Sequence, residues 1–395
     1  MAGGALVSGG RVLVIGGVGQ IGRHAVRLLG TFPEVQSVTI GDVDTTRAEL
    51  LAAELGDRGS MVRLDATDRA QLDLALAESD LVLNALGPFN RFGLPILTAA
   101  IENGVPYVDI CDDWEATELF LALDHHARAA GVTAIIGAGL SPGITNLLAV
   151  LAARGYESVD RLLTSWSLSG ASVEFEEAYD GHRPPGSAAM YHWIEQATGT
   201  IRVWRDGALA DVPPLERLVV RYPELGEAPV HTLGHPEPIT LPPVIGGVRE
   251  SLNVMTGPEW VFDALRDTAD RVNSGELTIA GGVERMANNT PPETREERLR
   301  LPSVWAMAEG SKDGRKVATA VRMAALPAHR MGGSTGYPAA IAALLVLRGD
   351  ITETGVLPPE RAIHPERFFA ELGRVTTPAV ASVDDLVIIE EEALA

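Results

Sequence analysis

The sequence predicts an α/β protein built on a doubly wound parallel sheet, into which a second, α+β domain is inserted. Three observations support this prediction. A short apolar strand at residues 12–15 runs through a glycine-rich turn into a helix. Strand-like and helix-like segments then alternate, with short connections, through the first third of the chain. After about residue 153 the alternation gives way to segments separated by pairs of prolines, and 395 residues are too many for one ordinary core.

The glycine-rich turn has the spacing G-x-G-x-x-G on Gly17, Gly19 and Gly22. In this setting the first glycine permits a tight turn, the second lets the backbone approach a pyrophosphate, and the third lets helix and strand pack closely. The helix N-terminus then offers free N–H groups and a partial positive charge to phosphates. An ordinary glycine-rich turn can share this spacing, but Asp42 also follows a second apolar run about 20 residues on. The pattern favours a Rossmann-type dinucleotide site.

The remaining elements of this first domain, residues 1–150, follow from the same alternation. Further parallel strands are expected at residues 35–40, 61–64, 81–83, 107–110 and 132–136. Helices are expected at residues 45–55, 68–76, 94–101 and 115–130. Ligands of such sheets lie beyond the carboxyl ends of the strands. The residues expected to contact the cofactor are Gly17, Gly19, Gln20, Ile21, Gly22, Asp42, Asp65, Ala66, Asn84, Ala85, Leu86 and Gly87.

Three of these cofactor residues have a stated alternative. Asp42 is expected to bond the adenosine ribose and to repel the extra phosphate of NADP, so NAD is the expected cofactor. Arg47, in the next helix, is the residue that would make NADP possible instead. Asp65 is expected either to bind the adenine amino group or to cap the helix that begins near Asp68. Asn84 is expected either to hold a ribose or carboxamide or to form a turn.

Carboxylates gather where the strand at residues 107–110 ends. Asp109, Asp112 and Asp113 fall within five positions, and such neighbours raise one another's pKa, which suits a general acid or a clamp for an ammonium group. Capping the next helix is the simpler role for Asp112 and Asp113, so Asp109 is the expected catalytic residue and Asp112 a candidate for substrate. After the sixth strand, Ser141 opens a helix whose N–H groups suit a substrate carboxylate, and a helix cap is its alternative role.

The inserted domain, residues 151–330, is expected to supply the substrate side through a mostly antiparallel sheet. Its polar residues include the candidate substrate ligands Glu174, Tyr179 and Glu237, the last in the stretch GHPEP. His192, on a short helix, is the second candidate catalytic residue. An exposed acidic loop and a satisfied core histidine are the alternative interpretations of these residues.

The final segment, residues 331–395, is expected to return to the first domain. A Gly/Ser/Thr loop at residues 332–336 leads into an apolar helix with Pro338 in its first turn, where proline is tolerated. Such a segment is either a plain buried helix or a contact for the ligand.

Composition excludes several classes of function. The chain has 32 Lys and Arg against 53 Asp and Glu, a formal charge of −21, so a nucleic-acid partner is not expected. Its one cysteine, Cys111, predicts no intrachain disulfide and a reducing cytoplasm. No signal peptide, membrane span or Cys/His zinc spacing is recognised, so neither a membrane nor a metal is expected.

These motifs together resemble one known family, the saccharopine dehydrogenase-like oxidoreductases. The resemblance rests on the stretches GGVGQIG, LVLNALGPF, GVPYVDICDD, GAGLSPGITNLLA, GHPEPITLPP, and TGYPAAIAALLVLRG with GVLPPE. The family includes saccharopine reductases, carboxynorspermidine dehydrogenases and lysine 6-dehydrogenases. The resemblance implies a Rossmann domain, an inserted substrate domain and nicotinamide-dependent chemistry at a carbon–nitrogen bond. The chain departs from the saccharopine reductases at Asp42, where they carry an Arg-bearing segment, and in its middle domain.

The sequence therefore predicts an NAD-dependent dehydrogenase or reductase that acts on an amino acid or amine through an imine. Two alternatives remain. One is a transferase or deaminase that uses bound NAD with no net redox change. The other is a non-catalytic protein that senses NAD(P)H. A homodimer is expected by analogy, through the sheet of the second domain.

Overall fold

The computed structural model describes residues 9–167, 188–288 and 301–394. The chain divides into two compact units, which are treated separately below. The first unit contains the chain up to Gly143 together with Pro327–Ala379, and the second contains Ile144–Leu326 together with Val380–Ala395. Among the described residues no helix is long and apolar enough to cross a membrane.

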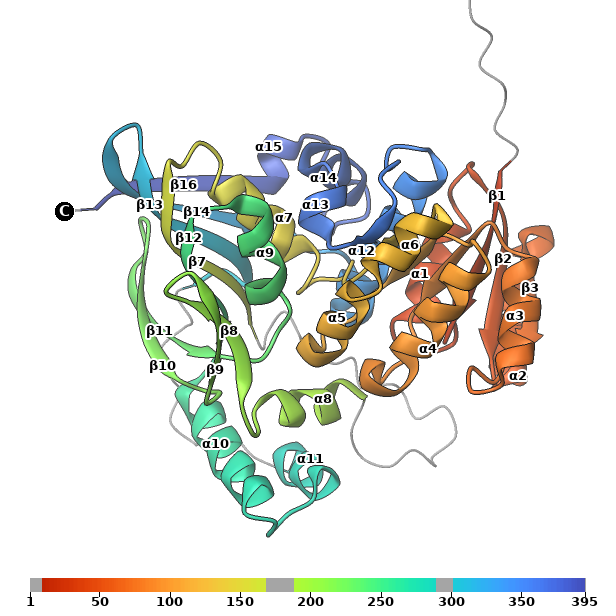
Figure 1. Ribbon diagram of the computed structural model, residues 1–395, viewed down its shortest axis with the longest axis horizontal. Coiled ribbons are helices and arrows are strands. Elements are labelled where there is room, and N and C mark those ends of the chain that lie inside the picture. Colours follow the sequence, from red (N-terminus) through yellow and green to blue (C-terminus); the bar gives the residue numbers. More distant parts are fainter. Residues whose placement is uncertain (1–8, 168–187, 289–300, 395) are drawn as a thin grey trace, which may run out of the picture. The chain divides into compact units, whose positions relative to one another are not determined.

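A seven-stranded parallel sheet forms the first unit, with the strand order β15-β6-β5-β4-β1-β2-β3. Figure 1 labels three of its strands, β1, β2 and β3. Its strands are β1 (Gly10–Ile15), β2 (Val35–Asp42), β3 (Gly59–Arg63), β4 (Leu81–Asn84), β5 (Tyr107–Asp109), β6 (Thr133–Ile135) and β15 (Gly355–Leu357). The order reverses at β1, which pairs with both β2 and β4. This reversal is the switch point at which open α/β sheets bind ligands. The predicted doubly wound sheet is confirmed.

Helices connect and flank these strands. They are α1 (Gly22–Leu29), α2 (Thr45–Glu54), η1 (Gly56–Arg58), α3 (Arg69–Ala77), α4 (Phe89–Glu102), α5 (Trp114–Leu121), α6 (Asp124–Ala130), α12 (Arg330–Leu347), α13 (Pro359–Ala362) and α14 (Pro365–Gly373). The single helix predicted at 115–130 is wrong, because the chain forms α5 and α6 instead. Asp124, the first residue of α6, accepts hydrogen bonds from Arg128 and from the Val356 N–H of β15, and so fixes the start of the second helix.

The predicted loop at residues 332–336 is also wrong, because these residues lie inside α12. Helix α12 packs closely against α1. A Cβ atom at Gly336 would stand 2.7 Å from the Ile21 carbonyl oxygen, and one at Gly332 would stand 2.5 Å from the His24 ring. The small residues therefore serve close helix–helix contact beside the glycine-rich turn.

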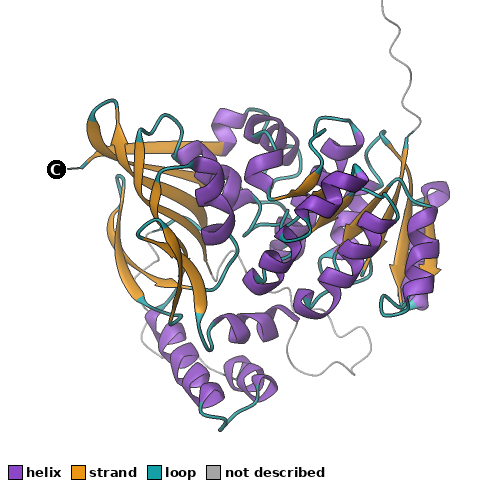
Figure 2. Ribbon diagram, viewed as in Figure 1, coloured by secondary structure: helices purple, strands orange, loops and turns teal. Residues whose placement is uncertain are grey.

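The second unit is built on a mixed nine-stranded sheet (Figure 2). Its main order is β10-β11-β12-β7-β13-β14-β16, and β8 joins β12 to β9. The strands are β7 (Ser158–Ser167), β8 (Ile201–Arg205), β9 (Ala208–Val212), β10 (Arg217–Tyr222), β11 (Gly226–Thr232), β12 (Val248–Thr256), β13 (Val304–Lys312), β14 (Arg315–Met323) and β16 (Val387–Ala393). Strand β12 runs parallel to β7 and the other pairs are antiparallel.

The helices of the second unit are α7 (Ile144–Ala152), α8 (Ala188–Gln196), α9 (Glu237–Ile245), α10 (Glu259–Asn273), α11 (Ile279–Ala287) and α15 (Val383–Leu386). Helix α7 packs on β7, β13 and β14, so this unit begins a few residues before the expected boundary at 150. Strand β16 pairs with β14, so the segment 331–395 does not return to the first unit as a whole. Its last strand completes the second sheet instead.

Candidate functional site

The glycine-rich turn joins β1 to α1 with almost no room for side chains. Gly16 has a positive φ of 72°, which favours glycine. A Cβ atom at Gly22 would lie 2.3 Å from the Gly16 carbonyl oxygen. A glycine at position 22 therefore allows α1 to start against the turn, as expected for the third glycine of the motif. The turn forms the compact cradle that a pyrophosphate needs.

Asp42 ends β2 and contacts the same turn. Its Oδ2 accepts a hydrogen bond from the Val18 N–H at 3.3 Å, and its Oδ1 accepts one from the Asp44 N–H at 3.1 Å. Asp44 in turn caps α2 by accepting from the Arg47 N–H. Two backbone donors therefore orient the Asp42 carboxylate beside the cradle, which fits a ribose at this position.

The segment 84–87 follows β4 and lies against the glycine-rich turn. A Cβ atom at Gly16 would meet the Leu86 backbone at 3.0 Å. The Asn84 Oδ1 accepts from the Leu86 N–H at 3.0 Å, and its Nδ2 donates to the Tyr107 hydroxyl at 3.0 Å. Asn84 is fully buried, and these contacts are those of the turn-forming alternative. Its contact with cofactor stays a prediction, as do those of Ala85 and Gly87.

Asp109 completes a buried polar chain across the ends of three strands. Its Oδ2 accepts from the Tyr107 hydroxyl at 2.9 Å. Its Oδ1 accepts from the Gly137 N–H at 2.7 Å and from the Cys111 N–H at 3.0 Å. The carboxylate thereby ties the loops that follow β5 and β6 to the end of β4, through Tyr107 and Asn84. Protein donors of the described residues already reach both oxygens.

Burial raises the pKa of the Asp109 carboxyl to about 6. The three hydrogen bonds lower this pKa in part, and the neighbouring charge of Asp112 adds to the rise. Asp112 is only half-buried, so it is the more accessible carboxylate of the pair. Asp113 caps α5 by accepting from the N–H groups of Glu115 and Ala116, which is the capping role considered for it.

Two further predicted residues of the first unit have visible local roles. Asp65 accepts hydrogen bonds from the Thr67 N–H at 2.9 Å and from its hydroxyl at 2.6 Å. It does not cap α3, because Asp68 does. Ser141 lies in the loop after β6, where a cis bond joins it to Pro142. The predicted ligand contacts of Asp65 and Ser141 remain untested.

The second unit has its own buried carboxylate, Glu237, the first residue of α9. Its Oε1 accepts from the Thr145 hydroxyl at 2.8 Å and from the Asn253 Nδ2 at 3.0 Å. The Asn253 amide also donates to the Thr164 hydroxyl at 3.0 Å. His235 Nδ1 lies 3.5 Å from Glu237 Oε2. Side chains from α7, β7 and β12 thus hold the carboxylate next to an imidazole.

The His235 ring is almost fully buried and lies 5.6 Å from the ring of Trp166 on β7. The two side chains therefore form a buried histidine–carboxylate pair at ion-pair distance.

Of the remaining predicted residues of the second domain, the structure describes only His192. His192, on α8, has its Nε2 2.7 Å from the Gln196 side chain, one turn further along the same helix. Its neighbours Trp193 and Ile194 belong to a core cluster with Phe262 of α10. Glu174 and Tyr179 lie outside the described residues. Among the described residues no group of acidic, His or Cys side chains could hold a metal ion.

The sequence-based prediction missed several residues of these networks, among them Tyr107, Thr145 and Asn253. Tyr107 stands two positions before Asp109 on one strand, so the alternation of side chains along a strand could have paired them. Thr145 and Asn253 carried no such signal, because their meeting with Glu237 depends on how α7, α9 and β12 pack.

The cradle, the oriented acidic residue at the end of β2 and the parallel sheet define an NAD(P)-binding protein of the Rossmann type. Comparison with protein families then identifies the family. The chain matches the saccharopine dehydrogenase NADP binding domain over residues 12–135 and the saccharopine dehydrogenase C-terminal domain over residues 139–377. It therefore belongs to the saccharopine dehydrogenase family of oxidoreductases, as its motifs predicted.

Similar proteins extend over nearly the whole chain. A carboxyaminopropylagmatine dehydrogenase of Synechocystis sp. is 22% identical, over 93% of this chain and 96% of its own length. A carboxynorspermidine synthase of Vibrio cholerae is 24% identical, over 73% and 74%. The saccharopine dehydrogenase (L-Glu forming) of Saccharomyces cerevisiae shares the fold, with a TM-score of 0.61 at 17% identity over 98% of this chain and 100% of that one.

Proposed function

We propose that the protein is an NAD-preferring dehydrogenase or reductase that acts on the carbon–nitrogen bond of an amine or amino acid through an imine. The observation that carries the proposal is the dinucleotide cradle with Asp42 bonded to it. The names of two relatives support the substrate class, because agmatine and norspermidine are amines. These proteins match most of the chain, so the proposal extends to both units.

The reaction requires one hydride transfer and the movement of protons. Bound NAD⁺ supplies the acceptor for a hydride. The substrate C–H bond breaks, the nitrogen gives up a proton, and a C=N bond forms; addition of water then yields a carbonyl compound and a free amine. The reverse sequence joins an amine and a carbonyl compound. The chain itself must take and return the protons.

The second unit offers His235 for this proton transfer, with Glu237 as its positioning residue. Glu237 lies 3.5 Å from a ring nitrogen and would orient the imidazole toward the substrate. His192 and Asp109 stay predicted catalytic residues, but their contacts support other roles. His192 bonds within its own helix, and Asp109 is enclosed by donors that fix the loops after β5 and β6.

A cationic substrate also needs carboxylates. Asp112 in the first unit is half-buried at the end of β5 and is proposed to contact an ammonium group. The loop of Ser141 is proposed to bind a substrate carboxylate through backbone N–H groups. Glu174 and Tyr179 remain candidates for the substrate, and a homodimer remains a proposal.

A substrate panel tests the proposal directly. Amino acids, diamines, and pairs of amine and 2-oxoacid are incubated with NAD(H), while nicotinamide absorbance and products are followed. A net change in NADH with an imine-derived product supports the dehydrogenase. Formation of product without a net change in NADH supports the transferase alternative. Tight binding of NADH with no product from any substrate of the panel supports the sensor alternative.

The preference for NAD is tested by Asp42→Ala. Removing the carboxylate deletes a ribose acceptor and the charge that repels the NADP phosphate. We expect the NAD/NADP ratio of kcat/KM to fall by on the order of 10-fold or more. An unaltered protein that already uses NADP better would show that Arg47 outweighs Asp42, and this part of the proposal would be wrong.

The proton-transfer role is tested by His235→Gln, with His364→Gln, whose side chain is 67% exposed and belongs to no candidate site, as the control. We expect His235→Gln to lower kcat by on the order of 10²-fold, and the control to leave it nearly unchanged. Glu237→Gln should lower kcat with little change in KM, because the imidazole loses the charged group that positions it. An unchanged kcat in Glu237→Gln, or equal losses in the two histidine variants, would remove His235 from the reaction.

A further inference from the structure

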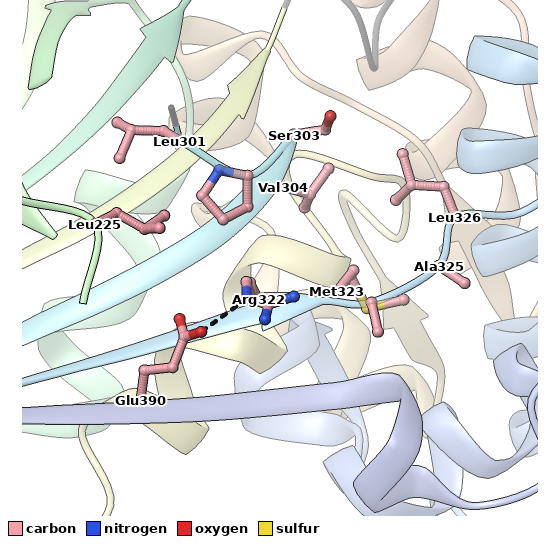
Figure 3. Close-up of a pocket in the computed structure, with 11 residues that line it drawn as sticks. Leu225, Leu301, Ser303, Val304, Arg322, Met323, Ala325, Leu326 and Glu390 are labelled. Atoms are coloured by element: carbon pink, nitrogen blue, oxygen red, sulfur yellow. Dashed lines mark hydrogen bonds and ion pairs between the residues drawn. The ribbon is translucent and has the colours of Figure 1, made fainter. Parts of the chain in front are cut away.

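The second unit contains a cavity of about 340 Å³, which lies away from the residues discussed so far (Figure 3). Its walls come from the turn between β10 and β11, the segment leading into β13, the end of β14, and β16. Leu225, Leu301, Val304 and Met323 contribute apolar side chains to a lining that also contains the polar side chains of Ser303, Arg322 and Glu390. A volume of this size suits a small organic molecule.

The register of the sheet places Arg322 on the face opposite to Glu237. Arg322 of β14, which lines the cavity, pairs with Trp305 of β13, and Trp305 pairs with Ser165 of β7. The three side chains therefore share a face. Thr164, the next residue along β7, points to the other face, where it bonds the Asn253 that holds Glu237. Val304, which also lines the cavity, pairs with Trp166 and so belongs to that other face, which means that the cavity lies at the ends of the strands and takes residues from both faces.

Arg322 supplies a fixed positive charge to the cavity. Its Nε donates to Glu390 Oε1 of β16 at 3.1 Å, the contact drawn as a dashed line in Figure 3. Within the part of the chain that the structure describes, this is the one protein hydrogen bond of the guanidinium, which has five N–H donors. Its side chain is 30% exposed, so the terminal nitrogens meet solvent in the cavity.

Glu390 anchors this arginine and is itself held in the sheet. Its side chain is only 11% exposed, and it lies beside the buried phenol of Tyr222. Burial, together with the charge of Glu390, raises the pKa of that phenol above its ordinary value. The Glu390 carboxylate is held in place and therefore orients the guanidinium before a ligand binds. This preorganisation lowers the conformational entropy that is lost on binding.

We infer that this cavity is a binding site for a small carboxylic acid with an apolar body. The two terminal nitrogens of an arginine match the two oxygens of a carboxylate, and the apolar walls match an aliphatic or aromatic body. Since the chain carries a net charge of −21, an anion needs such a local cation to bind at all. The site is independent of the proposed reaction, because its residues belong to neither the cradle nor the histidine–carboxylate pair.

The probe is hexanoate, and two matched controls are used. Hexanol has the apolar body but lacks the charge, and inorganic phosphate has the charge but lacks the apolar body. Binding is followed by NMR of labelled methionine methyl groups, with the Met323 signal assigned from Met323→Leu. We expect saturable shifts of the Met323 signal with a Kd on the order of 1 mM or tighter. Hexanol and phosphate should each bind at least roughly 10-fold more weakly than hexanoate. Hexanol cannot pair with the Arg322 guanidinium, and phosphate cannot contact the apolar side chains.

Two variants locate the site. Arg322→Gln removes the charge and should weaken hexanoate binding by about 10-fold or more, whereas Arg249→Gln, which changes a side chain that is 73% exposed elsewhere on the unit, should not. Leu225→Glu, at a 41% exposed wall position, should also weaken binding, by repulsion, without disturbing the core.

Three results would overturn the inference. They are no saturable shift of the Met323 signal up to about 10 mM, binding of phosphate as strong as that of hexanoate, and unchanged hexanoate binding in both Arg322→Gln and Leu225→Glu. NADH binding and circular dichroism of each variant are measured in parallel. If Arg322→Gln does not fold, Leu225→Glu and the Met323 signal still decide the outcome.

Discussion

Among the described residues, Asp109 of the first unit and Glu237 of the second are fully buried carboxylates, and the two are held in opposite ways. Asp109 accepts from two backbone N–H groups and one phenol, all near the ends of adjacent strands. Glu237 accepts from the side chains of Thr145 and Asn253, which come from elements far apart in sequence, and it has His235 beside it. If the carboxylate is removed, backbone N–H donors cannot reorient toward another acceptor, whereas side-chain donors can.

This difference separates structural from chemical use of a buried acid. A carboxylate fixed by backbone N–H groups shapes the loops that carry them, so Asp109 is suited to building the edge of the cofactor site. A carboxylate held by side chains beside an imidazole can position that imidazole for a reaction, so Glu237 is suited to a chemical role. Four measurements test or refine this comparison.

The largest expected effect is the loss of stability in Asp109→Ala. The variant leaves the Gly137 and Cys111 N–H groups buried without an acceptor, at roughly 1–3 kcal/mol each, in addition to the lost Tyr107 contact. We expect the free energy of unfolding to fall by about 4 kcal/mol. Denaturant unfolding measures it.

The matched control for this experiment is Asp109→Asn, which keeps an oxygen acceptor for the two N–H groups. We expect it to fold nearly normally and to lower kcat less than 10-fold. A loss of 10² or more in kcat at unchanged stability would restore Asp109 as a catalytic residue and break the comparison.

The second effect is a pH dependence of stability that comes from Asp109. Its pKa is about 6 in the folded protein against an ordinary 3.8, so the folded state holds an extra proton between these values. This contribution is therefore fully present below about pH 4 and is lost as the pH rises through about 6. It amounts to roughly 3 kcal/mol.

Other groups also titrate in this range, so the difference between unaltered protein and Asp109→Asn is the quantity to measure. Unfolding in urea at several pH values from 4 to 8 gives that difference. If it does not change with pH, the Asp109 carboxyl is ionised in the folded state throughout this range.

A smaller loss of stability is expected for Glu237→Ala. Thr145 and Asn253 lose an acceptor, but a hydroxyl can rotate and the Asn253 amide keeps its bond to Thr164. We expect about 2 kcal/mol, clearly less than for Asp109→Ala. Equal losses in the two alanine variants would show that the type of donor does not matter here.

The smallest effect is expected for Tyr107→Phe. It removes a hydroxyl that donates to Asp109 and accepts from Asn84, while the ring and its packing stay. We expect a loss of about 1–2 kcal/mol and a rise in the pKa of Asp109, since one hydrogen bond to the carboxylate is gone. An unchanged pKa, measured by NMR of the carboxyl carbon, would show that Tyr107 does not contribute to it.

The sequence predicts the first sheet well, because its signals are local. Apolar runs followed by glycine or aspartate mark the strands, and the motif from Gly17 to Gly22 identifies the cradle. The carboxylates at the strand ends follow from parallel topology alone. The capping role of Asp113 was also among the stated alternatives.

The rest depends on tertiary packing. No local pattern shows that the glycines of 332–336 lie inside α12, because their purpose is contact with α1. No sequence signal near Glu237 predicts that Thr145 and Asn253 bind its carboxylate. Likewise, no signal in residues 387–393 predicts that this strand pairs with β14 rather than packing on the first unit. These features follow from packing between distant segments, which periodicity does not record.

The strand order also affects the time course of folding during synthesis. Strand β15, at Gly355–Leu357, completes the first sheet beside β6, and β16, at Val387–Ala393, completes the second beside β14. The first sheet therefore lacks its last strand until residues 355–357 have been synthesised, and the second lacks its last strand until residues 387–393 have been synthesised. Until then β6 and β14 each have an unpaired edge, and exposed strand edges of incomplete sheets are prone to aggregate. Residues 355–393 thus supply the strand that closes an open edge in each of the two units.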